Sequence, residues 1–191
     1  MYVDRILYPI ETLGPGKRIV VWTAGCSKHC ENCANPELWD VEGKKNISVN
    51  DLAQIILNIC ADNQVDGITF TGGDPLEQSE ELLTVLGEIK TTIPDILVYT
   101  GYLLEDLQVL LDEQSYRQME QVVSVLIDGP YVDELNDGKC GLRGSVNQCI
   151  HFLDQTVQSE YDTYLSKGRK IQNIVMGNKF ISVGIHNRKK D

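Results

Sequence analysis

The chain has no long apolar run and no leader pattern. None of its hydrophobic stretches approaches the roughly 20 residues that a membrane-spanning helix needs. Residues 1–5 lack the charged and then apolar layout of a secretory signal peptide. Internal repeats, low-complexity segments and an interdomain linker are missing as well. At 191 residues, the chain is therefore expected to form a single cytoplasmic domain, residues 1–191, with a sizeable core.

Basic residues are few. Lysine and arginine number 17 against 28 aspartates and glutamates, which gives a formal net charge of −11. A chain this acidic repels the phosphates of nucleic acids and the headgroups of anionic membranes. Neither is expected as a partner.

Cysteine is scattered except in one loop. Cys26, Cys30 and Cys33 lie within eight residues at the spacing C-x3-C-x2-C. In a reducing compartment, clustered cysteines bind metals more often than they form disulfides. Iron–sulfur clusters and closed zinc sites usually take four protein ligands, so three cysteines leave one coordination position open. From the spacing alone, two interpretations remain: a cluster with an open iron, and a zinc site completed by His29 or another residue.

The other cysteines and the histidines give no metal-binding pattern. The spacing of Cys140 and Cys149 fits no common metal loop, so a second cluster is not expected. His29, His151 and His186 share no ligand spacing.

Apolar runs and amphipathic segments alternate along the chain. Strands are expected at residues 19–23, 67–71, 96–100 and 122–127. Helices are expected at residues 52–59, 82–89 and 104–111, and Ser48 is expected to cap the first of them. This alternation predicts an α/β fold with a parallel sheet, whose ligand sites lie beyond the carboxyl ends of the strands. Cys26, Gly72, Gly101 and Asp128 each follow one of these strands, so we expect them at one edge.

The C-terminal part follows a different pattern. A loop is expected after Pro130, then a strand within 146–152. Residues 171–176 and 180–185 flank Gly177 and Asn178, which predicts a hairpin with a two-residue turn. The basic residues 188–190 are expected to be a solvated tail.

Residues 71–76, Thr-Gly-Gly-Asp-Pro-Leu, form the second motif. Paired glycines at a strand end let the backbone approach a ligand closely, although the segment alone also fits a tight turn. Together with the cysteine loop, it resembles the motifs of the radical S-adenosylmethionine (radical SAM) enzymes. In these enzymes a glycine-rich segment holds the SAM amino group, and Asp74 stands where many members have Glu.

More narrowly, the chain resembles the activating proteins of anaerobic (class III) ribonucleotide reductase, which are glycyl-radical-enzyme activating enzymes. The resemblance covers about residues 8–151 and includes the segments 14–16, 99–102, 126–129 and 142–145. It implies a small, incomplete (βα) radical SAM barrel with parallel strands. Residues 152–191 would be a C-terminal extension that contains the β-hairpin.

The resemblance also implies a site. Cys26, Cys30 and Cys33 would bind one [4Fe-4S] cluster, whose fourth iron chelates SAM. The expected SAM-binding residues are Asn32, Gly72, Gly73, Asp74, Thr100 and Asp128. Asn32 replaces an aromatic residue common before the third cysteine, so its backbone would serve the adenine. Thr100 and Asp128 fit equally well as caps of a turn and a strand end.

The implied reaction needs no acid or base from the protein, since the cofactor supplies the chemistry. The reduced cluster cleaves SAM to methionine and a 5′-deoxyadenosyl radical, which takes hydrogen from a glycine of a partner such as anaerobic ribonucleotide reductase. The electron donor would be a flavodoxin or ferredoxin, and oxygen would stop the reaction. Two alternatives stay open: a radical SAM enzyme that modifies a peptide or small molecule, and a non-catalytic metal-binding interaction module.

Overall fold

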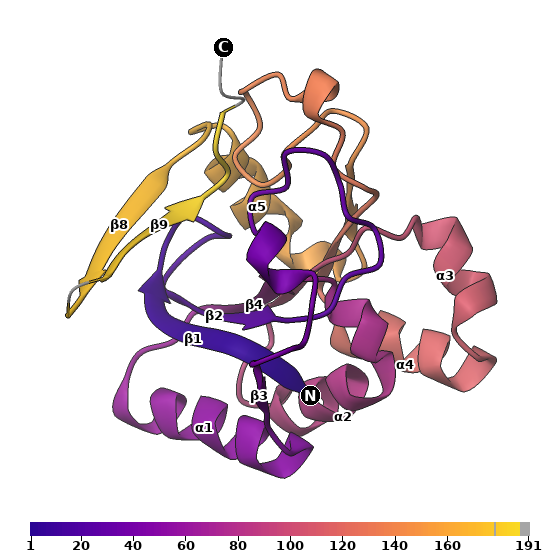
Figure 1. Ribbon diagram of the computed structural model, residues 1–191. Coiled ribbons are helices and arrows are strands. Elements are labelled where there is room, and N and C mark those ends of the chain that lie inside the picture. The colour runs from indigo at the N-terminus through magenta and orange to yellow at the C-terminus, as the bar shows by residue number, and fades with distance from the viewer. Residues whose placement is uncertain (178, 188–191) are drawn as a thin grey trace.

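A mixed seven-stranded sheet forms the centre of the protein (Figure 1). The computed structural model describes residues 1–177 and 179–187, so Asn178 of the expected turn and the basic tail at 188–190 lie outside the described residues. The strand order is β3-β1-β2-β4-β5-β6-β7. The strands are β1 (Tyr2–Ile10), β2 (Arg18–Thr23), β3 (Lys45–Asn46), β4 (Gly67–Gly72), β5 (Ile96–Tyr99), β6 (Val125–Asp128) and β7 (Cys149–Phe152).

The four central strands, β2, β4, β5 and β6, are parallel, as the alternating pattern predicts. The outer strands β1, β3 and β7 pair antiparallel to their neighbours. The predicted hairpin is also present, as β8 (Ile171–Met176) and β9 (Lys179–Gly184) in a sheet of their own. The result is a mixed α/β fold with a parallel centre.

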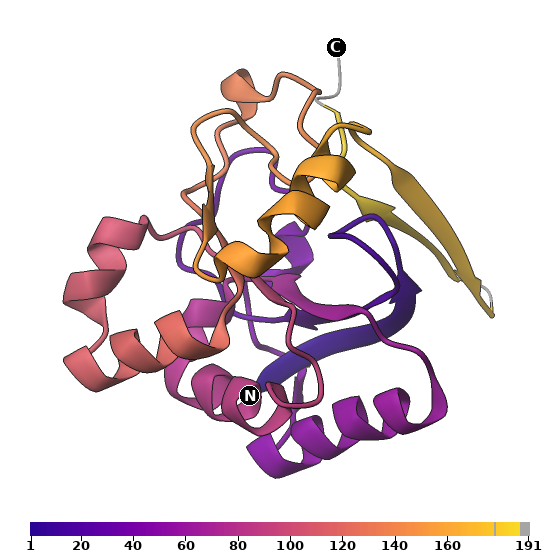
Figure 2. The same cartoon turned by 180° about the vertical axis from the view of Figure 1, so that it is seen from behind.

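Helices cover both faces of the sheet. The main core packs α1 (Val49–Asp62), α2 (Ser79–Ile89) and α4 (Glu113–Val122) against one face. Helix α5 (Gln158–Leu165) lies on the opposite side, where Tyr161 and Tyr164 pack on β5 and β6 (Figures 1 and 2). Helix α3 (Leu104–Leu110) follows β5, and the 3-10 turns are η1 (Pro36–Leu38), η2 (Pro75–Gln78), η3 (Asp133–Leu135) and η4 (Gln155–Val157). Every helix in the described part of the chain is too short or too polar to cross a bilayer.

The predicted helix boundaries agree with the local chemistry. Ser48 caps α1, because its hydroxyl oxygen accepts the backbone N–H of Asp51 at 3.1 Å. The prediction of a strand over residues 122–127 was wrong at the N-terminal end of the strand. Val122 ends α4 and β6 begins at Val125, so one apolar run spans two buried elements.

A buried arginine connects strands of the central sheet to α5. The Arg18 side chain is fully buried, and its guanidinium pairs with the Asp95 carboxylate. Its Nε donates to the Thr69 hydroxyl at 2.8 Å, and Nη2 donates to the Ile68 carbonyl at 2.7 Å. The Tyr161 hydroxyl of α5 donates to Asp95 at 2.9 Å. Strands from the first half of the chain are thus joined to a helix near its C-terminal end.

A second arginine attaches the C-terminal segment to the loop between β6 and β7. Arg169 Nε donates to the Cys140 carbonyl at 3.0 Å, and Nη2 donates to the carbonyls of Arg143 and Gly144, each at 3.1 Å. Its Nη1 donates to the Asn136 side chain and to the His186 carbonyl, each at 2.8 Å. The extension is therefore bonded to the body of the protein.

Candidate metal centre

The cysteine loop begins two residues after β2. It is closed at its base, since the Gly25 N–H donates to the Leu38 carbonyl at 2.9 Å and the Cys26 N–H to the Trp39 carbonyl at 3.0 Å. His29 and Asn32 have positive φ angles of 45° and 54°, in the left-handed region that Asn and His enter more readily than most residues. The loop can therefore reverse direction twice between its first and third cysteines.

Each of the three thiols faces backbone N–H groups. The Asn35 N–H donates to Cys33 Sγ at 3.5 Å. Burial raises the pKa of the Cys26 thiol, while backbone N–H groups of Lys28 and His29 act in the opposite direction. Burial likewise raises the pKa of Cys30, against the backbone N–H of Tyr131. Such N–H groups stabilise thiolate sulfur and tune bound iron, so this donor set fits an iron–sulfur cluster.

His29 does not converge with the cysteine sulfurs on one point. Within the described residues, the cysteine sulfurs and His29 form no group of three ligand atoms within 4.8 Å of one another. A four-iron cluster holds its cysteine sulfurs farther apart than one ion does, because iron and sulfide lie between them. His29 stacks on Trp39, with ring centroids 4.7 Å apart. His29 therefore packs on an aromatic ring.

The glycine motif packs directly on the start of this loop. The Gly73 N–H donates to the Thr23 carbonyl and the Asp74 N–H to the Gly25 carbonyl, each at 2.8 Å. A Cβ atom on residue 73 would lie 2.4 Å from the Gly25 oxygen. Gly72 has φ +112°, and a Cβ there would lie 2.5 Å from the Thr23 oxygen. Both positions need glycine because backbone meets backbone.

Asp74 and Thr100 connect the ends of β4 and β5. Asp74 is 1% exposed, and its carboxylate accepts the N–H groups of Leu76 at 3.1 Å and Gly101 at 2.8 Å. The Thr100 hydroxyl donates to the same carboxylate at 2.9 Å and accepts the Tyr102 N–H at 3.2 Å. Burial raises the pKa of Asp74, and these hydrogen bonds oppose the rise. Both side chains thus make the internal contacts of a turn cap.

Glu77 is a contact residue that the sequence reading missed. Its carboxylate accepts the N–H of Ser27 and the hydroxyl of Tyr102, each at 3.1 Å, and also the Ser27 hydroxyl. Lys28 Nζ lies 3.2 Å from the centre of the Tyr102 ring. Burial alone would raise the pKa of Glu77, but the hydrogen bonds from Ser27 and Tyr102 outweigh it and lower that pKa. The cysteine loop is therefore attached to the ends of β4 and β5.

Asp128 lies at the end of β6. Its carboxylate accepts the Leu104 N–H at 2.8 Å, at the start of α3, and the Cys149 N–H at 3.2 Å. These are the contacts of a strand-end cap. The backbone N–H of Tyr131, three residues further on, lowers the pKa of Cys30 against the effect of burial, so this edge also influences the cysteine loop.

The predicted residues thus fall into two groups. Gly72, Gly73, Asp74 and Thr100 are joined by hydrogen bonds to one another or to the base of the cysteine loop. Asn32 is exposed on the loop itself, and the Asp128 side chain contacts α3 and β7 instead.

Comparisons with known proteins agree with this geometry. The family model described as "4Fe-4S single cluster domain" matches residues 12–151, which leaves the β8–β9 hairpin outside the match. The chain is similar to the anaerobic ribonucleoside-triphosphate reductase-activating protein of Escherichia coli K12, at 32% identity over 76% of this chain and 96% of that protein. The proteins of the same name from bacteriophage T4 and Haemophilus influenzae are 35% and 36% identical. These matches cover 78% and 75% of this chain, and 92% and 94% of the relatives.

Proposed function

We propose a function from the premise that this chain belongs to the 4Fe-4S single cluster domain family and, within it, groups with the anaerobic ribonucleoside-triphosphate reductase-activating proteins. It is a radical SAM activating enzyme that cleaves SAM reductively and generates a glycyl radical on a partner enzyme. The observation that supports this most directly is the packing of the glycine motif against the base of the loop that carries the three clustered thiols.

Cys26, Cys30 and Cys33 would hold three irons of a single [4Fe-4S] cluster and leave the fourth open to SAM. When bound, the cluster supplies the electron for cleavage of the cofactor. The protein's task is to place SAM beside it. The N–H groups of Gly73 and Asp74 are already bonded to Thr23 and Gly25, so this segment would bind the SAM ammonium group through carbonyl oxygens, which accept hydrogen bonds.

The remaining SAM contacts are proposed with different roles. Asn32 would face the adenine from the loop. Thr100 and Asp74 would act mainly by fixing the strand ends, because their polar atoms already bond one another. Asp128 keeps its proposed SAM role only if its carboxylate can give up the contacts it makes to α3 and β7.

The fold proposal follows the same family. The curved parallel centre would be an incomplete (βα) radical SAM barrel, with antiparallel strands at its edges. We also propose one domain, residues 1–191, because Tyr161 and Val183 from the extension are buried in clusters with residues of the central sheet.

The proposed partner is an anaerobic ribonucleotide reductase, the enzyme that the relatives' name specifies. A flavodoxin or ferredoxin would supply the electron. A reducing cytoplasm is the proposed compartment, since all six cysteines are free thiols.

The test is anaerobic reconstitution with iron and sulfide, followed by reduction with SAM present. Release of 5′-deoxyadenosine is expected, and a glycine-centred radical should appear by electron paramagnetic resonance when purified anaerobic ribonucleotide reductase is added. Cys33→Ala should abolish both signals, whereas Cys60→Ala, remote from the loop on α1, should keep them.

Other outcomes separate the alternatives. Release of 5′-deoxyadenosine without a radical on the reductase would favour a peptide or small-molecule substrate. Retention of zinc with no cleavage of SAM would leave a non-catalytic metal-binding module.

A further inference from the structure

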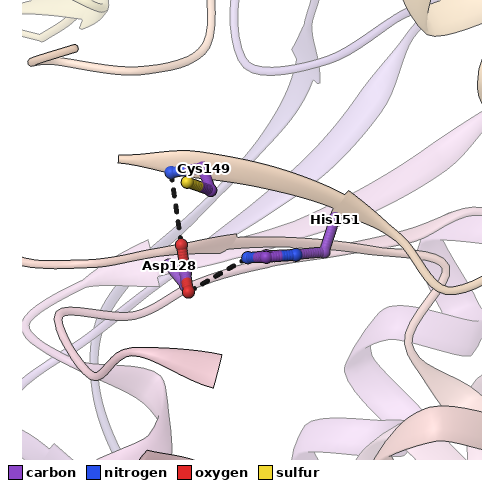
Figure 3. A group of neighbouring side chains, drawn as sticks. All are labelled: Asp128, Cys149 and His151. Carbon is purple, nitrogen blue, oxygen red and sulfur yellow. Dashed lines mark hydrogen bonds and ion pairs between the residues drawn. The ribbon is translucent and has the colours of Figure 1, made fainter. Parts of the chain in front are cut away.

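Three side chains of different chemistry meet where β6 pairs with β7. Asp128 lies opposite Cys149 in the antiparallel register, and His151 lies two residues further along β7. Residues two apart on a strand point to the same face of a sheet. One ligand atom from each of these three residues lies within 4.8 Å of the other two. Figure 3 shows the three side chains where the two strands meet.

The His151 imidazole and the Cys149 thiol make few hydrogen bonds within this group. His151 Nε2 lies 3.0 Å from the Asp128 carboxylate, yet this nitrogen is buried and makes no hydrogen bond of acceptable geometry. The Cys149 thiol has one long contact, 3.9 Å to the Asn147 carbonyl. An Asp–His ion pair would account for two of the side chains but not for the thiol beside them.

The ligand set indicates which ion would fit. Carboxylate oxygen, thiolate sulfur and imidazole nitrogen are the three donors that Zn²⁺ binds in proteins. Asp128 already accepts two N–H groups, and an ionised carboxylate has about four lone-pair sites, so it can still bind a cation. Cys149 is exposed, which gives the ion a path from solvent.

We propose that Asp128, Cys149 and His151 form a second metal site, separate from the cysteine loop, that binds a zinc-type divalent cation. Three protein ligands leave the fourth tetrahedral position to water. The ion would hold together the two ends of the 129–148 segment, which includes Tyr131 beside Cys30. This metal site goes beyond the proposed function. In it, the free lone pairs of the Asp128 carboxylate would bind the metal ion in place of SAM.

The experiment measures zinc in the reconstituted enzyme, in which iron occupies the cysteine loop. The protein is equilibrated under nitrogen with Zn²⁺ buffered by a chelator, desalted, and analysed for zinc and iron. One zinc per chain is expected in addition to the cluster iron. Cys149→Val and His151→Gln should each weaken zinc binding about tenfold or more. Cys140→Val, at a free cysteine outside the group, should leave it unchanged.

Co²⁺ identifies the ligands directly. In the wild type it should give a thiolate-to-cobalt charge-transfer band and the intense visible bands of a tetrahedral ion. The charge-transfer band should disappear in Cys149→Val, while iron content and circular dichroism confirm that the variant is folded. No stoichiometric zinc in the wild type, or wild-type zinc affinity in both ligand variants, would overturn the proposal.

The two proposals fail separately. Zinc content is read without SAM, so loss of the second site leaves the activating function untouched. Absence of SAM cleavage likewise leaves the zinc measurement valid.

Discussion

Gly73 occupies a place where two backbone segments meet without room for a side chain. The Gly25 oxygen stands 2.4 Å from the position that a Cβ would take, and backbone cannot move aside as a flexible side chain can. The identity of this residue therefore sets the distance between the glycine motif and the cysteine loop.

Gly73→Ala should lower the free energy of unfolding by about 1–3 kcal/mol, as overpacking does, and should reduce iron retained after reconstitution. Gly87→Ala is the matched control. Its nearest neighbour would be the Gln118 side chain at 3.7 Å on the exposed side of α2, so it should stabilise the protein by up to about 1 kcal/mol. Denaturant unfolding and iron analysis measure both. Equal iron content in Gly73→Ala and wild type would contradict the assigned contact.

Glu77 gives a pH dependence with a defined sign. Its folded pKa lies below the ordinary value of 4.5, so the contact with Ser27 stabilises the protein above that pH and is lost as pH falls through the lowered value. Glu77→Gln should therefore destabilise the apoprotein at neutral pH by about 0.5 kcal/mol, because this exposed side chain is screened by solvent. The difference from wild type should vanish at acid pH in urea titrations. A constant difference across the range would show that ionisation plays no part.

Residue patterns predicted some of these contacts and missed others. The cysteine spacing, the paired glycines and the Ser48 cap are local features, and the sequence displays them. Glu77 contacts Ser27 across fifty positions of chain only because the loop folds back, so no local pattern reveals it. The spacing of Cys149 and His151 was a signal for their proximity, since alternate positions of a strand share a face.

At the scale of elements, the alternation of apolar runs and amphipathic helices predicted the four parallel strands, β2, β4, β5 and β6. Strand β1 was missed because its burial is irregular and its pairing with β2 shifts register twice, which hides the two-residue period. Helix α5 was missed because it buries tyrosines in place of an aliphatic stripe. Antiparallel edges depend on pairing partners that a single segment cannot specify.

Arg18 connects several of these elements, so its removal should be costly. Arg18→Met keeps much of the side-chain volume but leaves the Asp95 carboxylate without its buried cation. The free energy of unfolding should fall by about 3–5 kcal/mol in denaturant titrations. Arg117→Met breaks an exposed pair with Glu113 on α4 and should cost about 0.5 kcal/mol or less. Similar losses in the two variants would contradict a special role for the buried pair.

At the scale of the whole molecule, hydrogen bonds join the C-terminal extension to the loop between β6 and β7. Arg169 contacts Cys140, Arg143 and Gly144 through their carbonyl oxygens, and the family model ends before this arginine. The extension therefore supports, from outside the family match, a segment that lies within it.

Arg169→Met should speed amide hydrogen exchange in residues 136–144 and lower the free energy of unfolding by about 2 kcal/mol, because charged hydrogen bonds are lost. Exchange in α1, on the far side of the sheet, should not change. Lys167→Met, at an exposed position nearby, is the control and should leave both quantities at wild-type values. Unaltered exchange in the 136–144 loop would mean that other contacts are sufficient to hold it.

The burial of the Arg18–Asp95 pair also has a consequence for protein synthesis. Arg18 is synthesised first, Asp95 follows 77 residues later, and the Tyr161 hydroxyl that completes their contact follows a further 66 residues later. Until Tyr161 has been synthesised, the ionised Arg18 guanidinium of the nascent chain stays hydrated, although its final position is fully buried. The sheet can therefore reach its final packing only after α5 has been made.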